Sequence, residues 1–337
     1  MVRLIKTIAR NYVFPFLTQT GLVKVIASNA SGNRIIVMFH GVVKQTDFEL
    51  PVNHIYCIDF ERQLKYYSEN FKIVSLSDIF NSWHEGDVKE RLMAITFDDG
   101  YENNYTNAFP ILQKYQAPAT IFVVTKILES LDYVLWYDLI DLVKQKVSID
   151  FFKNKAHLLS ESRREIIANS VNWNQLKDGM KKLDTKEKEL ILQRHDPQII
   201  QTLCQGNKEY RNVLNKNQML EMIESGLVEI GSHTHNHPNL DQISIEEAKI
   251  EIEYSKKLIE QTLNYKVKSV AFPDGAYNES VKKLCLDAGF KNLLAVDYKL
   301  PSDQSDISIL PRYCVSNTTT VESNIVQIYN SFRKKGF

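Results

Sequence analysis

The segment 92–100, LMAITFDDG, places two adjacent aspartates and a glycine directly after a run of apolar residues. An apolar run of this length is typical of a strand that is buried on both faces. Gly100 permits a sharp turn, so the carboxylates of Asp98 and Asp99 can both lie at the strand end. In parallel α/β folds, that end of the sheet carries the active site. The alternative is that one aspartate only caps the following helix.

Strand and helix patterns alternate on both sides of this segment. Strands are expected near residues 35–39, 72–76, 92–97, 119–124, 228–232, 268–272, 292–296 and 307–310, and helices near residues 59–70, 103–115, 216–225, 244–263 and 277–288. Such alternation implies parallel strands joined by right-handed crossovers. The sequence therefore predicts an α/β fold, a distorted (β/α) barrel of about seven parallel strands. An open, doubly wound sheet is the alternative.

Residues 126–215 interrupt the alternation with a long, charged and mostly helical pattern that has Trp136 and Tyr137 near its start. We interpret this block as a helical insertion at the carboxyl ends of the strands, where it could form a lid or a substrate platform. The alternative is a helical decoration or an oligomer contact. The barrel then comprises residues 31–125 and 216–337. Residues 1–30 are expected to form an N-terminal helical segment, packed on the barrel or resting on a membrane surface.

Composition limits the classes of function. The chain has 337 residues with 41 basic and 41 acidic side chains, a balance that does not favour a nucleic-acid partner. Its four cysteines, Cys57, Cys204, Cys285 and Cys314, are scattered and are expected to be reduced thiols. Neither an apolar signal-peptide core nor a membrane span is apparent. We therefore expect a cytoplasmic protein, which would be peripheral to the membrane if its N-terminal helix binds the membrane surface. The sequence does not indicate the oligomeric state.

A second polar segment follows another strand. Residues 231–238, GSHTHNHP, contain three of the eight histidines of the chain. His233 and His237 are four residues apart, so one helical turn would place both imidazoles on one face, while His235 would point elsewhere. Two imidazoles and one carboxylate form the ligand set of a hydrolytic metal site. The alternative is a surface histidine cluster that binds no metal.

The TFDDG at 96–100 and the HTHNH at 233–237 resemble the two signature motifs of the polysaccharide deacetylase family, also called the NodB-homology or carbohydrate esterase 4 family. The segments 214–231 and 271–275 resemble further family elements. The resemblance implies that Asp99, His233 and His237 bind a divalent metal, with zinc as the expected ion, and that Asp98 is the general base. It also implies a substrate-binding role for Asp274, whose backbone N–H would stabilise the oxyanion.

The sequence departs from the family pattern in two places. Many members have an arginine that orients the base where this chain has Ala271, and Arg312 is the candidate replacement among the substrate-binding residues. Many members also supply a general acid from a C-terminal histidine, but no histidine follows His237. The segment around His40 resembles the exopolysaccharide N-deacetylase subgroup, which makes His40 the predicted general acid and His235 the next candidate. His54, His84, His157 and His195 are expected in surface or loop positions.

These patterns together predict metal-dependent hydrolysis of N-acetyl groups on a sugar or glycan. A nucleotide-linked or lipid-linked precursor is one candidate substrate. One alternative is hydrolysis of another C–N amide bond in the same fold. Another is a catalytically inactive carbohydrate-binding protein, although a binding protein has no need for adjacent Asp98 and Asp99.

Overall fold

A single parallel sheet organises the molecule. The computed structural model describes residues 9–23, 33–44, 50–83, 90–144, 146–194, 196–197, 199, 201, 208–209 and 211–334. The order of the strands is β10-β9-β8-β7-β6-β5-β1-β11, every described pair is parallel, and β4 lies beside β5. The strands are β1 (Arg34–Phe39), β4 (Lys72–Ile73), β5 (Leu92–Phe97), β6 (Ala119–Val123), β7 (Val228–Ser232), β8 (Ser269–Ala271), β9 (Asn292–Ala295), β10 (Ile309–Pro311) and β11 (Tyr313–Cys314).

The two edges of this sheet are joined by one residue. β10 pairs with β9, and β11 pairs with β1 at the other edge, yet only Arg312 separates β10 from β11 in the chain. The sheet therefore curls until it nearly closes, and the predicted distorted (β/α) barrel is confirmed, with eight strands along the closing path. The alternative of an open sheet is wrong.

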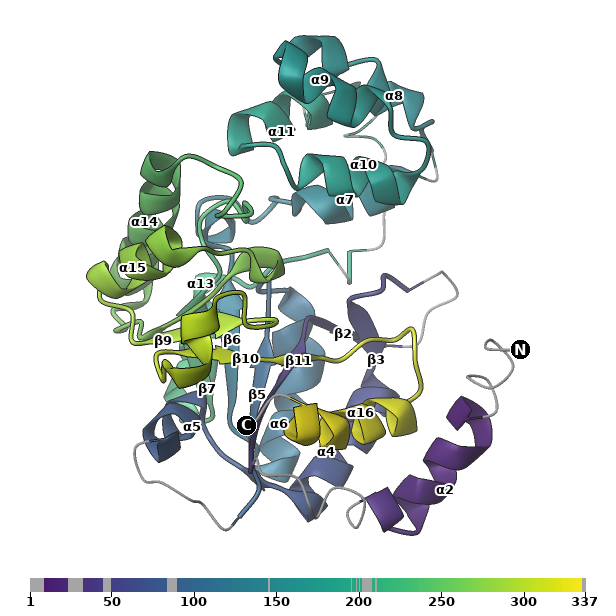
Figure 1. Cartoon of the computed structure of the whole chain (residues 1–337), viewed down its shortest axis with the longest axis vertical. Helices are drawn as coiled ribbons and strands as arrows, with labels where there is room; N and C mark the ends of the chain where they lie inside the picture. Colours follow the sequence, from purple (N-terminus) through teal and green to yellow (C-terminus); the bar gives the residue numbers. More distant parts are fainter. Residues whose placement is uncertain are drawn as a thin grey trace.

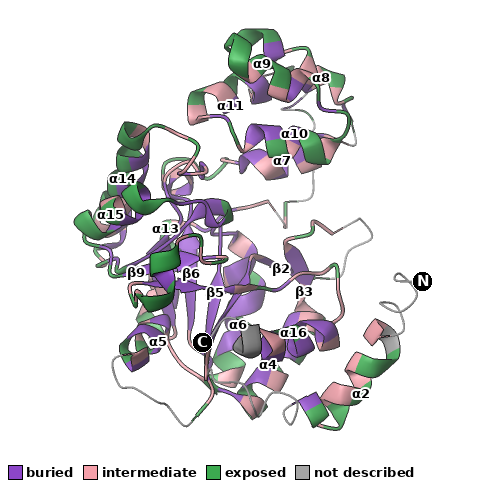
Figure 2. Ribbon diagram, viewed as in Figure 1, coloured by how far each residue is buried: buried purple, intermediate pink, exposed green. Residues whose placement is uncertain are grey.

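Alternate residues of each strand face different cores, as the period of two in a strand requires. One position from most strands enters a cluster inside the barrel, whose strand members are Ile36, Leu92, Ala94, Phe122, Ala271, Leu294 and Leu310. β7 contributes Gly231 at this level, where a Cβ would lie 2.5 Å from the ring of Phe122. The intervening residues, such as Val37 and Ile95, pack in a larger cluster beneath the surrounding helices. Most residues of the long strands are accordingly buried, while the helices expose their outer faces (Figure 2).

Helices surround the sheet (Figure 1). They are α4 (Cys57–Asn70), α5 (Leu76–Ser82), α6 (Phe109–Tyr115), α13 (Lys216–Glu224), α14 (Ile245–Leu263), α15 (Glu279–Asp287) and α16 (Val321–Lys334). The strand expected at 72–76 is only two residues long, because α5 begins at Leu76. The pattern also missed α16 and a small two-stranded sheet, β2 (Gly41–Val43) with β3 (His54–Tyr56).

Within the described residues between β6 and β7, five helices form a separate layer beyond one end of the barrel, whereas α13 packs with the barrel helices (Figure 1). The five are α7 (Trp136–Val143), α8 (Asp150–Lys153), α9 (Glu161–Ala168), α10 (Trp173–Met180) and α11 (Thr185–Leu192). This insertion has its own apolar core, which includes Trp136, Leu139, Leu176 and Met180. The amphipathic pattern of these helices therefore serves the core of the insertion itself, because each helix buries one apolar stripe against its neighbours.

The N-terminal segment packs on the barrel over its described part. Ala9–Val13 form a π-helical turn, α2 (Phe14–Gln19) contacts α16, and Val23 enters the main core. None of the described helices combines the length and the apolar character needed to cross a bilayer. Cys57, Cys285 and Cys314 are free thiols, and Cys204 lies outside the described residues.

Candidate active site

Strand parity brings four polar side chains to the mouth of the barrel. His40, Asp98, His233 and Arg312 each follow an interior barrel position by two or four residues, counting from Ile36, Ala94, Gly231 and Leu310. Side chains two apart on a strand share a face, so these four point toward the barrel axis at its carboxyl end. All four line one cavity of about 570 Å³.

Asp98 and Arg312 form a buried bidentate pair. The guanidinium donates to Oδ1 of Asp98 at 2.7 Å and to Oδ2 at 2.8 Å, with a further bond to Oγ1 of Thr96 at 3.3 Å. Burial alone would raise the pKa of Asp98, but the attraction of Arg312 and of His233 outweighs it and lowers the pKa. The carboxylate is therefore ionised and held in a fixed orientation. Arg312, the expected replacement for the arginine that orients the base, thus lies against Asp98.

Asp99 reaches the same space by a different route. Its φ of 79°, followed by 80° at Gly100, turns the chain through the left-handed region directly after β5. The side chain is 1% exposed, and neither carboxylate oxygen has a hydrogen-bond partner of good geometry among the described residues. Burial and then the neighbouring charge of Asp98 raise the pKa of Asp99 well above its usual value, although the nearby hydroxyl groups of Tyr137 and Tyr101 act to lower it. A buried carboxylate without partners indicates a place for a cation.

The two histidines converge through a loop, so the predicted helical turn is wrong. Residues 233–238 are not helical, and left-handed φ values of 65° at Thr234 and 57° at His237 fold the segment back on itself. Oγ1 of Thr234 accepts the N–H of His237 at 3.1 Å. The carboxylate of Glu251, on α14, accepts the N–H groups of His235 and Asn236 at 2.9 and 2.8 Å. Non-glycine left-handed residues are uncommon and gather at functional sites.

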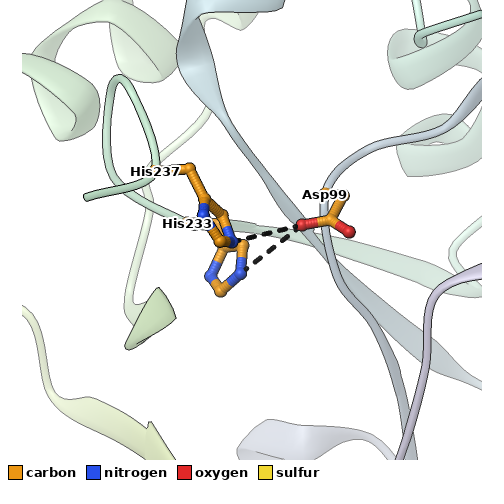
Figure 3. Close-up of side chains that lie close together, drawn as sticks. All are labelled: Asp99, His233 and His237. Carbon is orange, nitrogen blue, oxygen red and sulfur yellow. Dashed lines mark ion pairs between the residues drawn. The ribbon is translucent and has the colours of Figure 1, made fainter. Parts of the chain in front are cut away.

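Asp99, His233 and His237 form the only group of metal-type ligands found among the described residues (Figure 3). Oδ1 of Asp99 lies 3.6 Å from Nε2 of His233 and 3.6 Å from Nε2 of His237. Ligand atoms around a tetrahedral zinc, each about 2.0–2.1 Å from the metal, lie roughly 3.3–3.5 Å apart. The two distances from Asp99 thus suit a small divalent ion, and all three ligand atoms lie within 4.8 Å of one another.

The protonation of both imidazoles suits that role. Nδ1 of His233 lies 2.8 Å from the carbonyl oxygen of Ala271, so this nitrogen carries the proton and Nε2 is left with a lone pair. Burial lowers the pKa of His233, and burial followed by the nearby His233 lowers the pKa of His237 well below its usual value. Both rings are neutral at neutral pH and available as ligands. Ala271, which stands where many family members have an arginine, therefore orients the candidate metal ligand His233 through its backbone carbonyl.

His40 lies beside Asp98 at the ends of adjacent strands. β1 and β5 pair in register as far as Phe39 and Phe97, and the N–H of Asp98 donates to the carbonyl of Phe39 at 3.0 Å. Burial lowers the pKa of His40 to about 4, against an opposing effect of Asp98. Nδ1 of His40 is buried without a hydrogen-bond partner. Among the described residues, no acidic or carbonyl group therefore holds this ring nitrogen.

The other histidines lie elsewhere. Nδ1 of His235 is 2.9 Å from Oγ1 of Thr125, and its ring packs edge-on against Tyr254, away from the metal-type cluster. His54 is fully buried, contrary to the expected surface position, because its ring fills the space left beside Gly41. His157 is exposed as expected, whereas His84 and His195 lie outside the described residues.

The insertion forms the far wall of the cavity. Tyr137 and Asp141 of α7 and Lys177 of α10 line it together with the barrel residues. Trp136 is mostly buried in the core of the insertion, and Tyr137 presents its ring 5.2 Å from that of His237. Asp274, with a φ of 52°, stands on the rim, where its carboxylate accepts from Nζ of Lys181 at 3.1 Å. Residues 126–215 therefore contribute to the mouth of the barrel.

Fold and site together define a class of protein: a (β/α)-barrel hydrolase with an Asp–His–His cluster beside an arginine-paired aspartate. Residues 85–293 match the family described as polysaccharide deacetylase. The chain belongs to this family, a group of carbohydrate esterases and deacetylases that hydrolyse C–N bonds. The matched range contains Asp98, Asp99 and both candidate ligand histidines, whereas His40 and Arg312 lie outside it.

Individual relatives agree with this assignment. The chain is 22% identical over 287 residues to a poly-β-1,6-N-acetyl-D-glucosamine N-deacetylase of Staphylococcus aureus (strain MRSA252), covering 82% of this chain and 72% of the relative. The Streptococcus pyogenes deacetylase PplD in complex with acetate superimposes with a TM-score of 0.57 at 18% identity, covering 88% of this chain and 97% of that one. IcaB from Ammonifex degensii gives the same TM-score and coverage at 15% identity. At these identities the structural likeness shows the shared fold.

Proposed function

We propose that this protein is a metal-dependent N-deacetylase that hydrolyses N-acetyl groups on a sugar or glycan. One observation carries the proposal: Asp99, His233 and His237 converge beside an Asp98 that Arg312 holds ionised, all within one cavity. This arrangement separates ligand from base, which amide hydrolysis by a metal site requires. The Staphylococcus aureus relative is named for such a reaction.

A divalent ion, with zinc as the expected one, would be held by Asp99, His233 and His237, where it lowers the pKa of water and polarises a carbonyl group. The carboxylate of Asp98 takes the proton from the attacking water. Its lowered pKa keeps it unprotonated, and the two bonds from Arg312 fix the direction of the free lone pairs. The N–H of Asp274, on the rim, is the proposed donor to the developing oxyanion.

The departing amine needs a proton, and His40 is placed to give it. With a pKa of about 4 the ring is neutral at neutral pH, so it must gain a proton before it can act as an acid. The adjacent Asp98 gains one when it deprotonates the water. When Asp98 passes this proton to His40, its restored negative charge favours the protonated ring. His40 can then donate the proton to the leaving amine.

Acetate release tests the proposal. Purified protein loaded with zinc should release acetate from N-acetylglucosamine oligomers, the chelated protein should not, and restored zinc should return the activity. Asp98→Asn should retain zinc and lose most of the activity. Hydrolysis of other amides but not of any N-acetyl sugar would indicate a different C–N hydrolase. Glycan binding without hydrolysis by the loaded protein would indicate a binding protein; either result overturns the proposal.

A further inference from the structure

The cavity wall formed by the insertion is basic, and its charge comes from two helical faces. On α7 and its C-cap, Tyr137, Asp141 and Lys144 recur at intervals of four and three residues and line the cavity. On α10 and its C-cap, Asn174, Lys177 and Lys181 do the same. The intervening apolar residues, such as Leu139 and Leu176, fill the core of the insertion. Each helix thus turns its polar stripe toward the cavity.

The lysines of this wall outnumber the carboxylates that hold them. Asp141 accepts from Lys144 at 3.1 Å and from Lys177 at 2.5 Å, so two ammonium groups share one carboxylate. Lys181 pairs with Asp274 across the rim. The three lysine side chains remain 24–37% exposed, which leaves their remaining N–H donors open to a ligand. Exposed pairs of this kind are weak, so an incoming anion can replace a carboxylate at little cost.

The charge of the whole cavity points the same way. Its lining contains four basic side chains, Lys144, Lys177, Lys181 and Arg312, and four acidic ones, Asp98, Asp99, Asp141 and Asp274. These charges cancel, so the divalent ion of the proposed function would leave the lining with two positive charges. Arg312 is occupied by Asp98, so one of the two surplus charges lies at the ion beside Asp99 and the other lies among the three lysines, which face only Asp141 and Asp274. A substrate with a compensating negative charge fits this cavity better than a neutral one.

We propose that the substrate carries a phosphate group, as a sugar phosphate or as a diphosphate ester, bound by Lys144, Lys177 and Lys181 while its N-acetyl group faces Asp98. Lysine ammonium groups bind phosphate as point charges, and three of them line this wall. Among the described lining residues the only arginine is the one committed to Asp98. This inference rests on the proposed function and specifies its substrate class.

Three N-acetylglucosamine probes test the assignment: the neutral methyl glycoside, the 1-phosphate and the uridine diphosphate ester. The zinc-loaded protein should release acetate from the two charged probes with a kcat/KM at least about tenfold higher than from the glycoside, through a lower KM. Added salt should reduce this preference. The better of the two charged probes identifies a sugar phosphate or a nucleoside diphosphate as the source of the phosphate group, and either supports the assignment.

Lys177→Gln should raise KM for the charged probes about tenfold and leave the neutral probe within about twofold. Lys186→Gln, an exposed lysine on α11 outside the cavity lining, is the matched control and should change neither. Equal kcat/KM for neutral and charged probes, or an equal loss for both in Lys177→Gln, overturns the phosphate assignment while leaving the deacetylase proposal intact.

Calorimetric binding to zinc-loaded Asp98→Asn separates the two proposals. Tighter binding of the 1-phosphate than of the glycoside supports the phosphate site even if the wild-type protein hydrolyses neither these probes nor the N-acetylglucosamine oligomers, a result that would end the deacetylase proposal alone. Equal affinity for the charged and neutral probes in this variant overturns the phosphate site.

Discussion

Asp98 and Asp99 are adjacent in the chain but lie in opposite electrostatic environments. Asp98 continues the inward parity of β5 and meets the guanidinium of Arg312, which lowers its pKa despite burial. Asp99 would point outward by the same parity, but its left-handed backbone turns it back into the cavity, where no cation accompanies it. One residue of offset thus separates a paired, ionised carboxylate from one that is free to hold an ion.

Removal of Arg312 should move the acid limb of the pH–rate profile. In the wild-type protein the pKa of Asp98 is lowered, so the base stays ionised below the usual carboxyl pKa of about 3.9. In Arg312→Met burial is opposed only by His233 and His40, which should raise that pKa, so kcat/KM should fall at neutral pH and recover as the pH rises. Arg312→Lys keeps the charge without the bidentate geometry and should shift less.

Thermal unfolding must accompany that experiment, because breaking a buried pair costs about 3–5 kcal/mol. The sign of the pH effect on stability should also reverse. A lowered carboxyl pKa stabilises the wild-type fold above the unfolded pKa, and that contribution is lost as pH falls through the folded pKa. A raised pKa in Arg312→Met makes acidification stabilising as the pH falls from the raised folded pKa to the unfolded pKa of about 3.9. An acid limb that stays in place would show that Asp98 is not the titrating base.

The acid role of His40 predicts a leaving-group dependence. His40→Ala should lower kcat on an N-acetyl sugar by about 10²–10⁴-fold, since the amine departs poorly without a proton. The loss should be much smaller for 4-nitrophenyl acetate, whose leaving group needs little protonation. His157→Ala, an exposed histidine outside the cavity, is the control. Equal losses on both substrates, or loss of bound zinc, would exclude the acid role.

At the scale of elements, the loop at 233–237 is held in place by α14. The carboxylate of Glu251 binds two backbone N–H groups and the side-chain amide of Asn236, and burial raises its pKa although these hydrogen bonds oppose the effect. The N–H groups of Thr125 and Lys126 donate to the carbonyls of Thr234 and His235 from the other side, each at 3.0 Å. Contacts from α14 and from Thr125 and Lys126 therefore hold the left-handed residues of this loop in place.

Glu251→Leu should consequently weaken zinc binding without touching a ligand. Loss of the three hydrogen bonds frees the loop to relax, and supporting contacts of this kind are worth about 10–100-fold in metal affinity. Chelator competition would measure the change. Glu253→Gln, two residues along the same helix and exposed, should bind zinc normally. Unchanged affinity in a folded Glu251→Leu protein would mean that the loop is rigid on its own.

These elements also mark where sequence reasoning succeeds. Strand parity is visible in the residue numbers, so the meeting of His40, Asp98 and His233 at one end of the sheet follows from the apolar runs before them. The convergence of His233 and His237 was predicted, but for the wrong reason, because spacing alone does not distinguish a helical turn from a loop with two left-handed residues. Glu251 carried no signal, since a glutamate within a helical pattern reads as a solvated side chain.

At the scale of the molecule, barrel closure and the active site meet at one residue. Arg312 lies between β10 and β11, so the bond that holds Asp98 also crosses from the closing strands to β5. The short strands around it were hard to predict, because two or three residues give no period. The charged faces of α7 and α10 have a clear helical period, but the sequence does not show that they face a cavity instead of water. Only the tertiary fold supplies that information.

Metal binding should stabilise the whole fold, because the folded chain alone brings the three ligands together. Zinc at about 100 times its dissociation constant should add roughly 2.7 kcal/mol to the free energy of unfolding. Asp98→Asn leaves the ligands intact and should show the same zinc-dependent rise in Tm, while its activity falls by about 10²–10⁴-fold. Asp99→Asn should be more stable than the zinc-free wild type, since it removes a buried carboxylate without partners, and should gain little from zinc. The opposite pattern, with zinc stabilising Asp99→Asn and not Asp98→Asn, would exchange the roles of the two aspartates. Calorimetry of the three proteins with and without zinc therefore decides which carboxylate holds the ion and which takes the proton.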